Sequence, residues 1–189
     1  RRQRQMCIRD RATTTGYMLF KRFNRSISKT SPGVASQNRP SIIFRLADFY
    51  LIYAEVANEV NPSDSRVLTY LNLVRERAGL PKVEILNPGI VGNKELQRAA
   101  IQRERQIELA TEGQRYFDVR RWMIADKDGE GRQNGYAHGM NVRGTINDTE
   151  EFNRVVETEK IVFNRKMYLQ PIPDHEMRKT QNLVQNPGW

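Results

Sequence analysis

The chain has 189 residues, of which 38% are hydrophobic and 28% are charged, and its formal net charge is +9 at pH 7. This composition is typical of a globular protein rather than a disordered one, and no stretch approaches the roughly 18 apolar residues of a membrane-spanning helix. Residues 1–11 resemble translated non-native sequence and are set apart from the fold. They contribute +4, which leaves a modest +5 for residues 12–189 and argues against a nucleic-acid-binding protein.

The first part of the chain predicts extended structure and then a helix. In residues 12–25, apolar and polar side chains alternate from Gly16 onward, which indicates a strand or an extended segment. Residues 26–40 are rich in Ser, Asn, Gly and Pro and predict a loop. Residues 42–60 carry apolar side chains on more than one side of a helical wheel, so we expect a helix buried against several partners. Its helically spaced apolar positions are Phe44, Ala47, Leu51, Ala54 and Ala57, with Tyr50 and Tyr53 along a second edge.

A second helix follows immediately. Asn61-Pro62 ends the first helix, and the polar run 63–65 offers caps for a helix that ends before Gly79. Residues 45–81 then have the length of one tetratricopeptide helix–turn–helix unit. A single unit of this kind cannot bury both of its faces. We therefore expect an exposed apolar surface that further helices would cover.

A third helix, after a loop at residues 82–92, combines apolar and acidic positions on one face. Asn93 can cap it. Glu104 and Glu108 fall within an arc that also holds Leu96, Ala100, Ile107 and Ala110. A buried charge is destabilising by several kcal/mol or so unless it is paired. The nearby cations available for pairing are Arg103, Arg105, Arg115, Arg120 and Arg121.

Gly113 divides this segment into two helices, because glycine readily adopts the left-handed conformation that ends a helix. The second helix places Asp118 and Trp122 on one side. Residues 126–144 contain five glycines and predict an irregular surface excursion. Beyond them the sequence leaves room for short strands around residues 155–163 and a short helix from Asp174.

Three blocks of sequence resemble one known family. Residues 104–122 read ERQIELATEGQRYFDVRRW, close to the ERR-x-EL-x-x-EG-x-R-x-x-DLRRW signature of SusD-like (RagB/SusD) proteins. Residues 45–81 and the closing block at 168–189, with its PIP and QNPGW motifs, are also similar to this family. The resemblance implies a mainly α fold with a tetratricopeptide-like helix pair, long irregular loops and room for short strands. The signature positions, which we interpret as structural, are Glu104, Arg105, Glu108, Glu112, Gly113, Arg115, Asp118, Arg121 and Trp122.

No residue is assigned to catalysis or to a metal. Glutamates on adjacent turns of one helix lie on one side of any substrate, whereas a glycosidase needs its two carboxylates on either side of the scissile bond. His138 and His175 are far apart in sequence, the chain has one cysteine, and no zincin or phosphate-binding motif is present. The sequence therefore predicts neither an enzyme nor a cofactor.

Aromatic side chains are the natural candidates for sugar capture, because binding sites combine apolar walls with a few placed polar groups. Tyr136, in the glycine-rich segment, is the ligand-binding candidate. Tyr17 is a weaker one, and we interpret Trp122 and Trp189 as packing residues. The resemblance carries over no ligand-contact residue, since none of the family's contacts matches a fixed motif here.

The resemblance implies non-catalytic capture of glycans or similar nutrients at the surface of Gram-negative bacteria, and delivery to a TonB-dependent (SusC-like) transporter. It implies no nucleic-acid partner, and membrane attachment only through a lipid anchor on a preceding amino-terminal part. On this interpretation residues 12–189 form the carboxyl-terminal part of a SusD-like domain that is incomplete at its amino end. The alternative is a helical-repeat scaffold that binds another protein and no small ligand.

Overall fold

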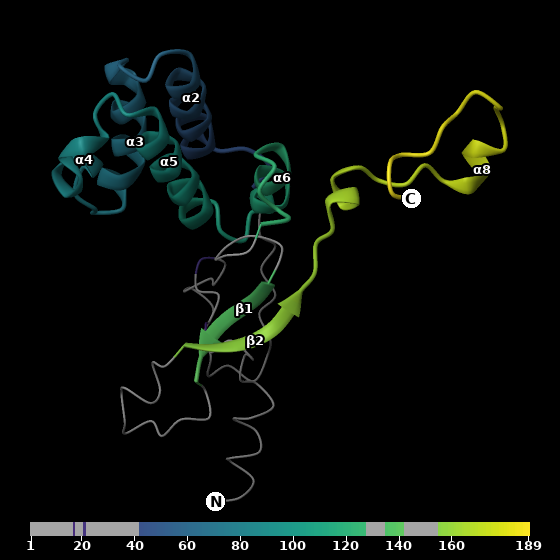
Figure 1. Ribbon diagram of the computed structural model, residues 1–189. Helices are drawn as coiled ribbons and strands as arrows, with labels where there is room; N and C mark the ends of the chain where they lie inside the picture. Colours follow the sequence, from purple (N-terminus) through teal and green to yellow (C-terminus); the bar gives the residue numbers. More distant parts are fainter. Residues whose placement is uncertain (1–16, 18–20, 22–41, 128–134, 142–154) are drawn as a thin grey trace, which may run out of the picture. The chain divides into compact units, whose positions relative to one another are not determined.

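The computed structural model describes residues 17, 21, 42–127, 135–141 and 155–189. It divides into two compact units, Arg39–Asp118 and a second unit of Val119–Trp189 with Arg1–Asn38. Within the described ranges the structure is mainly α-helical with two short strands, which confirms the predicted fold class (Figure 1). The strand and loop predicted for residues 12–40 and the boundary at residue 11 lie outside the described residues, Tyr17 and Lys21 excepted.

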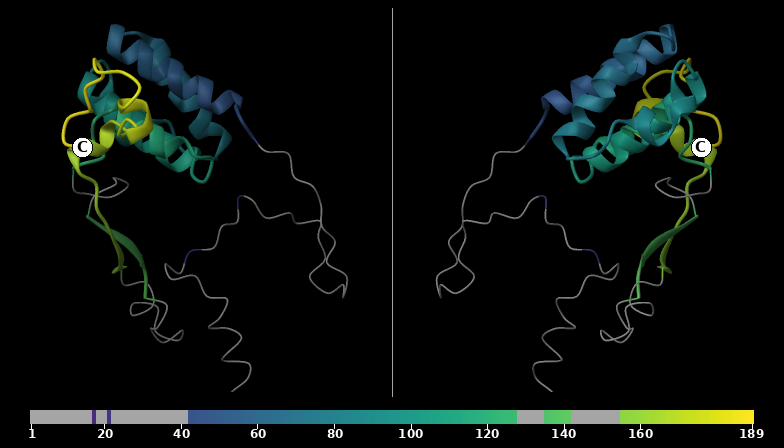
Figure 2. Two further views of the ribbon diagram at one scale, coloured as in Figure 1. Left: turned by 90° about the vertical axis from the view of Figure 1, so that its right-hand side faces the viewer. Right: turned by 90° about the vertical axis from the view of Figure 1, so that its left-hand side faces the viewer.

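The first unit is built on the predicted helix pair. Helix α2 (Leu46–Val60) packs along α3 (Ser65–Arg77), as Figures 1 and 2 show. Asp64 caps α3, since its side chain accepts a hydrogen bond from the backbone N–H of Arg66 at 2.9 Å. Gly79 follows α3 with a φ of 75° and supplies the expected left-handed exit.

Short helical turns replace the loop that was predicted for residues 82–92. These are α4 (Val83–Leu86) and the 3-10 helix η1 (Pro88–Ile90). Buried Asn72 of α3 holds α4, because its Oδ1 accepts the Val83 N–H and its Nδ2 donates to Glu84 Oε2. The prediction of a loop was wrong because this anchor lies 11 residues upstream and leaves no local signal.

Helix α5 (Lys94–Glu108) completes the unit by packing against α2 and α3. Asn93 caps it as predicted, since its Oδ1 accepts the Leu96 N–H at 3.1 Å. The buried core side chains of the unit come from every helix described so far and from η1. They are Leu51, Ala54, Val67, Leu71, Val74, Val83, Ile90 and Ile101.

Two predicted helix faces differ from the structure. Helix α5 turns Gln97, Ile101, Glu104 and Arg105 inward, while Leu96 and Ile107 are 40% and 59% exposed. Two of these inward residues, Glu104 and Arg105, are charged side chains that form ion pairs with other helices. Helix α2 packs against two partners, α3 and α5, but it buries only one side. Its outer stripe consists of the exposed residues Leu46, Phe49, Ile52, Tyr53, Val56 and Val60. Phe44 was expected within this helix but precedes it and is exposed.

The second unit begins at Val119, within α6 (Gln114–Arg121). Strands β1 (Gly135–Met140) and β2 (Val155–Ile161) pair antiparallel, with an irregularity between Ala137 and His138. Next come the 3-10 helix η2 (Arg165–Tyr168) and α8 (Asp174–Met177), the short helix expected from Asp174. A small core is formed by Val119, Ala125 and Phe163, against which Ile124, Met167 and Tyr168 pack.

Strand β1 corrects one prediction and β2 confirms another. The segment that was read as an irregular excursion contains β1, because residues 135–140 pair with a strand about 20 residues further along the chain. The room left for strands near residues 155–163 is occupied by β2. Among the described residues, no helix is both long and apolar enough to span a membrane.

Candidate functional sites: the charge network and a cation-lined groove

A buried guanidinium joins three helices at the centre of the signature segment. Arg105 of α5 donates from Nη1 to Asp48 Oδ1 at 2.9 Å, and from Nε to Asp118 Oδ2 at 2.9 Å. Arg105 Nη2 also donates to Asp118 Oδ1, so this pair is bidentate. All three side chains are at least 94% buried. The planar fork of arginine is therefore needed here, since lysine cannot make this pattern.

The signature glutamates pair with arginines from distant parts of the chain. Glu104 Oε2 accepts from Arg75 Nη1 of α3 at 2.8 Å. Glu108 Oε1 accepts from both Arg45 Nη1 and Arg77 Nη2 at 2.6 Å. The sequence indicates pairing only with arginines near the glutamates, because these partners lie 29 to 63 residues away.

Arg45 closes the network at the start of α2. Its Nε donates to Glu112 at 2.8 Å, and its Nη2 donates to the backbone carbonyl of Glu108 at 2.7 Å. Burial alone lowers the pKa of Arg45, but the hydrogen bonds to Glu112 and Glu108 outweigh it and the net pKa is raised. Arg45 thus stays charged and caps the carboxyl end of α5, where a cation is favourable.

The geometry of the network suits stabilisation rather than proton transfer. Each of the four carboxylates at Asp48, Asp118, Glu104 and Glu108 accepts from a guanidinium at 2.6–2.9 Å. None of them lies in the groove described below. We therefore assign these residues no role in chemistry.

Of the remaining signature residues, Gly113 lies between α5 and α6, Arg115 and Arg121 lie within α6, and Trp122 follows it. Gly113 has a φ of 85°, the left-handed conformation expected from the sequence, and Thr111 has a φ of 70°. Trp122 is half-buried, and the guanidinium carbon of Arg121 lies 4.6 Å from its ring centroid. Arg115 is half-buried within α6. Thr111 and Gly113 therefore give the chain its left-handed turn between α5 and α6.

Tyr136, the predicted ligand residue, lies on a strand rather than in a loop. It is 48% exposed in β1 and faces its cross-strand partner Lys160, whose ammonium is 5.9 Å from the ring centroid. Its role stays a prediction. His138 lies on the same strand, and His175 lies in α8. In the part of the chain that the structure describes, no group of His, Cys, Asp and Glu side chains could hold a metal ion.

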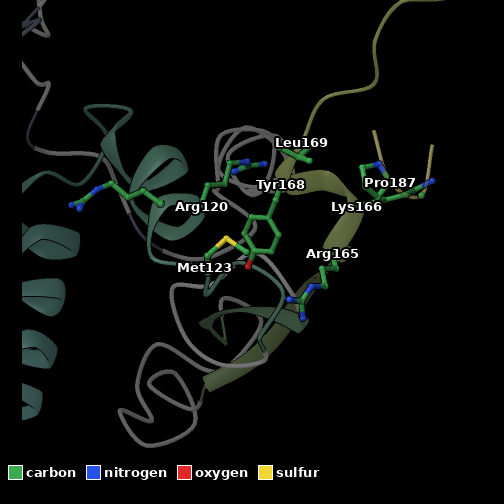
Figure 3. Close-up of a pocket in the computed structure, with 9 residues that line it drawn as sticks. Arg120, Met123, Arg165, Lys166, Tyr168, Leu169 and Pro187 are labelled. Carbon is green, nitrogen blue, oxygen red and sulfur yellow. The ribbon is translucent and has the colours of Figure 1, made fainter. Parts of the chain in front are cut away.

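A groove of about 780 Å³ lies within the second unit, between residues 120–123, 165–169 and 187–188. We call it the cation-lined groove. Its basic lining residues are Arg120, Arg121, Arg165 and Lys166, and its less polar ones are Met123, Tyr168, Leu169 and Pro187. No acidic residue appears among the described residues that line it. Figure 3 shows Tyr168 between Arg120 of α6 and Arg165 of η2.

The tyrosine in this groove is fixed by an acid behind it. The Tyr168 hydroxyl donates to Asp126 Oδ1 at 2.5 Å and accepts the Asp126 N–H at 3.1 Å. Burial, and then the bond to Asp126, raise the pKa of the Tyr168 hydroxyl, and the same bond lowers the pKa of Asp126. The ring of Tyr168 also packs edge-on against Phe163. Its position therefore does not depend on a ligand.

The side chains of the closing QNPGW motif form hydrogen bonds to the backbone of residues 166–172. The Gln185 side-chain amide pairs in both directions with the backbone of Ile172, and Asn186 Nδ2 donates to the Gln170 carbonyl. The Trp189 indole N–H donates to the carbonyl oxygens of Lys166 and Leu169 at 3.1 and 3.0 Å. Trp189 was predicted to be a packing residue, and the hydrogen bonds by which the motif holds the backbone beside the groove were not predicted.

Comparison with known proteins agrees with this architecture. The model of the SusD family matches residues 2–189. The chain belongs to the SusD family. Members of this family are in general non-catalytic, glycan-binding nutrient-capture proteins. The SusD-like protein P2 of Formosa agariphila is 31% identical over 78% of this chain and 26% of its own length. The SusD-like protein P25 of that organism is 44% identical over 47% of this chain and 16% of its own length.

Solved structures give the same result. BT4246 is 34% identical with a TM-score of 0.65, over 81% of this chain and 24% of that protein. The SusD-like protein BF3747 of Bacteroides fragilis is 31% identical with a TM-score of 0.62, over 79% of this chain and 26% of that protein. The chain thus spans about a quarter or less of the length of these SusD relatives.

Proposed function

We propose that this SusD chain belongs to a protein that captures glycans or similar nutrients at the cell surface and delivers them to a TonB-dependent, SusC-like transporter. The family match across residues 2–189 is the observation that carries this proposal. The charge network supports it, since the signature carboxylates are engaged in ion pairs that join helices. The protein acts by binding and releases its ligand unchanged.

The proposal places the protein in the outer membrane, facing outward. Membrane attachment is through a lipid anchor on a segment that precedes these residues, and no nucleic acid or cofactor takes part. Tyr136 remains the proposed ligand contact outside the groove, because it is a half-exposed aromatic ring on β1. Residues 12–189 form the carboxyl-terminal part of the capture domain, and residues 1–11 are proposed to lie outside it.

A glycan array probed with the purified protein tests capture. Binding to one class of oligosaccharide, weakened by Tyr136→Ala, is the expected result. Co-purification with the SusC-like transporter encoded in the same gene neighbourhood tests delivery. An array on which no glycan binds, together with a neighbourhood that encodes no such transporter, would contradict the proposal.

One observation favours the alternative, a helical-repeat scaffold for another protein. The outer stripe of α2 presents Phe49, Val56 and Val60 to solvent at 57%, 56% and 80% exposure. Apolar surface of this kind commonly marks a protein contact. The two functions separate in one experiment: charged substitutions in the stripe abolish partner binding by a scaffold but leave glycan capture unchanged.

A further inference from the structure

We infer that the cation-lined groove binds an acidic saccharide, one whose rings carry carboxylate or sulfate groups. The inference rests on the proposed function and narrows the ligand from glycans in general to the anionic class. It uses residues that lie outside the signature network and that do not include Tyr136.

The first support is the charge of the lining. Arg165 and Lys166 are consecutive residues at the start of η2, and Arg120 reaches the groove from α6 (Figure 3). A guanidinium binds a carboxylate or a sulfate through two parallel hydrogen bonds, and an ammonium adds a mobile point charge. The cationic groups of Arg120, Arg121 and Lys166 lie over the rings of Phe163, Trp122 and Trp189, a contact that leaves their positive charge in place.

Asp126, the acid bonded to Tyr168, is not among the described residues that line the groove. Asp126 is engaged by the Tyr168 hydroxyl, and the charges of Arg165 and Lys127 help to lower its pKa. The negative charge of Asp126 therefore offsets part of the positive charge of Arg165, although Asp126 does not line the groove. Lys166 lies at another side, with its ammonium 4.2 Å from the Trp189 ring centroid. The groove keeps positive charge at separated points, as an anionic chain requires.

The second support is the less polar part of the lining. Tyr168, Met123, Leu169 and Pro187 contribute apolar surface between the cations. Small-molecule sites usually occupy about 300–1,000 Å³ and combine apolar walls with a few charged groups. The volume of about 780 Å³ lies in that range. A saccharide offers both apolar C–H faces and anionic substituents, whereas an inorganic anion would use only the cations.

The third support is that the groove is held in place without a ligand. The Trp189 indole bonds to the carbonyls of Lys166 and Leu169 on one side. Gly188 has a φ of 86°, and a Cβ there would lie 2.9 Å from Cβ of Lys166. Only glycine permits this close approach. A prebuilt site loses less entropy when it binds than one that must be ordered first.

The test is titration calorimetry of the 189-residue chain with three hexasaccharides. A sulfated heparin hexasaccharide and hexagalacturonate represent the two anionic groups, and maltohexaose is the neutral control. We expect both anionic hexasaccharides to bind, with an affinity that falls as the salt concentration is raised. Maltohexaose should give no binding signal. Arg165→Gln and Lys166→Gln should each weaken binding about tenfold, as expected for the loss of a hydrogen bond to a charged group.

Arg178→Gln is the matched control, because it removes the same charge from an exposed residue that follows α8 and does not line the groove. Equal losses in the control and the groove variants would show attraction to net charge alone and would overturn the inference. Failure of both anionic hexasaccharides to bind would overturn it too. Binding of maltohexaose together with failure of both anionic hexasaccharides to bind would keep the proposed function and reject the anionic ligand. A hexaglutamate peptide that binds as tightly as the saccharides would reassign the groove to acidic protein segments.

Discussion

Arg105 connects Asp48 of α2 and Asp118 of α6 inside the helical unit, where water cannot replace it. Truncation to alanine leaves two buried carboxylates without their shared cation. We expect Arg105→Ala to lower the free energy of unfolding by about 3–5 kcal/mol, the usual effect of breaking a buried pair. Urea unfolding followed by circular dichroism measures this change.

Arg103 on the same helix provides the matched control, because its side chain is exposed. Arg103→Ala should change stability by about 0.5 kcal/mol or less. A triple variant with Asp48→Asn, Arg105→Met and Asp118→Asn should recover most of the loss, since it removes the buried charges together. If Arg105→Ala unfolds at the parent's urea concentration, the three-helix ion pair contributes little to stability.

Glu59 makes a surface bridge between α2 and α5. It accepts from Arg98 Nε at 2.6 Å and lies 3.0 Å from the ammonium of Lys94. The bond from Arg98 lowers the pKa of Glu59 from 4.5 to about 2, with burial opposing and Lys94 assisting. Because the folded pKa is depressed, the stabilisation is complete above about pH 4.5 and is lost as the pH falls towards 2.

We therefore expect Glu59→Gln to destabilise the chain at pH 7 by less than about 1 kcal/mol, since the pair is exposed and screened by solvent. The difference between parent and variant should shrink between pH 4.5 and pH 2, which urea unfolding at several pH values can follow. High salt at pH 7 should also reduce it. A difference that grows on acidification would contradict this assignment.

The joint between α5 and α6 depends on Gly113. Its φ of 85° is unfavourable for any residue with a Cβ, although no atom lies within 4 Å of where that Cβ would be. Gly113→Ala should therefore lower the free energy of unfolding through backbone strain alone, by about 1–2 kcal/mol. Gly113→Asn should have a smaller effect, because asparagine tolerates this conformation better.

Gly89 in η1 is the control for this substitution. It does not have a positive φ, and a Cβ there would meet only Asn87 Oδ1 at an ordinary 3.6 Å. Gly89→Ala should leave the melting temperature nearly unchanged, while Gly113→Ala lowers it. Equal melting temperatures for Gly113→Ala and the parent would show that the chain can turn at this joint without the left-handed conformation.

The helices themselves were predictable because their limits are local. Each helix limit is set by a residue next to it in sequence, so it can be recognised from the local sequence alone. These residues are Asp64, Gly79, Asn93 and Gly113. The faces of the helices were less predictable. A hydropathy pattern predicts that an arginine is exposed. Arg105 is instead buried, because it pairs with two aspartates from other helices.

The candidate site shows the same division. The signature glutamates were correctly singled out as paired, yet Arg75 and Arg45 were missed, since nothing near Glu104 or Glu108 in sequence points to them. Tyr136 was expected in a loop because its neighbours include glycines. The strand β1 forms because it pairs with residues 155–161 of β2, and the local composition around Tyr136 does not indicate this pairing.

The SusD chain spans about a quarter or less of the length of its relatives, which can explain why the stripe on α2 is exposed. Side chains at positions 46, 49, 53, 56 and 60 repeat at the spacing of a helix-packing seam and are exposed. A helical-repeat unit needs neighbours on both faces. We therefore expect further helices to cover this stripe in proteins of the relatives' length.

The 189-residue chain should self-associate through this stripe when it is studied alone. Phe49→Glu combined with Val56→Lys should reduce its sedimentation coefficient at high concentration and its binding of an apolar fluorescent dye. Neither change should lower the melting temperature by more than a few degrees, since both side chains are more than half exposed. Leu73→Glu on α3 removes exposed apolar surface outside the stripe and should affect association much less. Association that persists in the double variant would show that another surface brings the chains together, and that the seam spacing of α2 has no packing role.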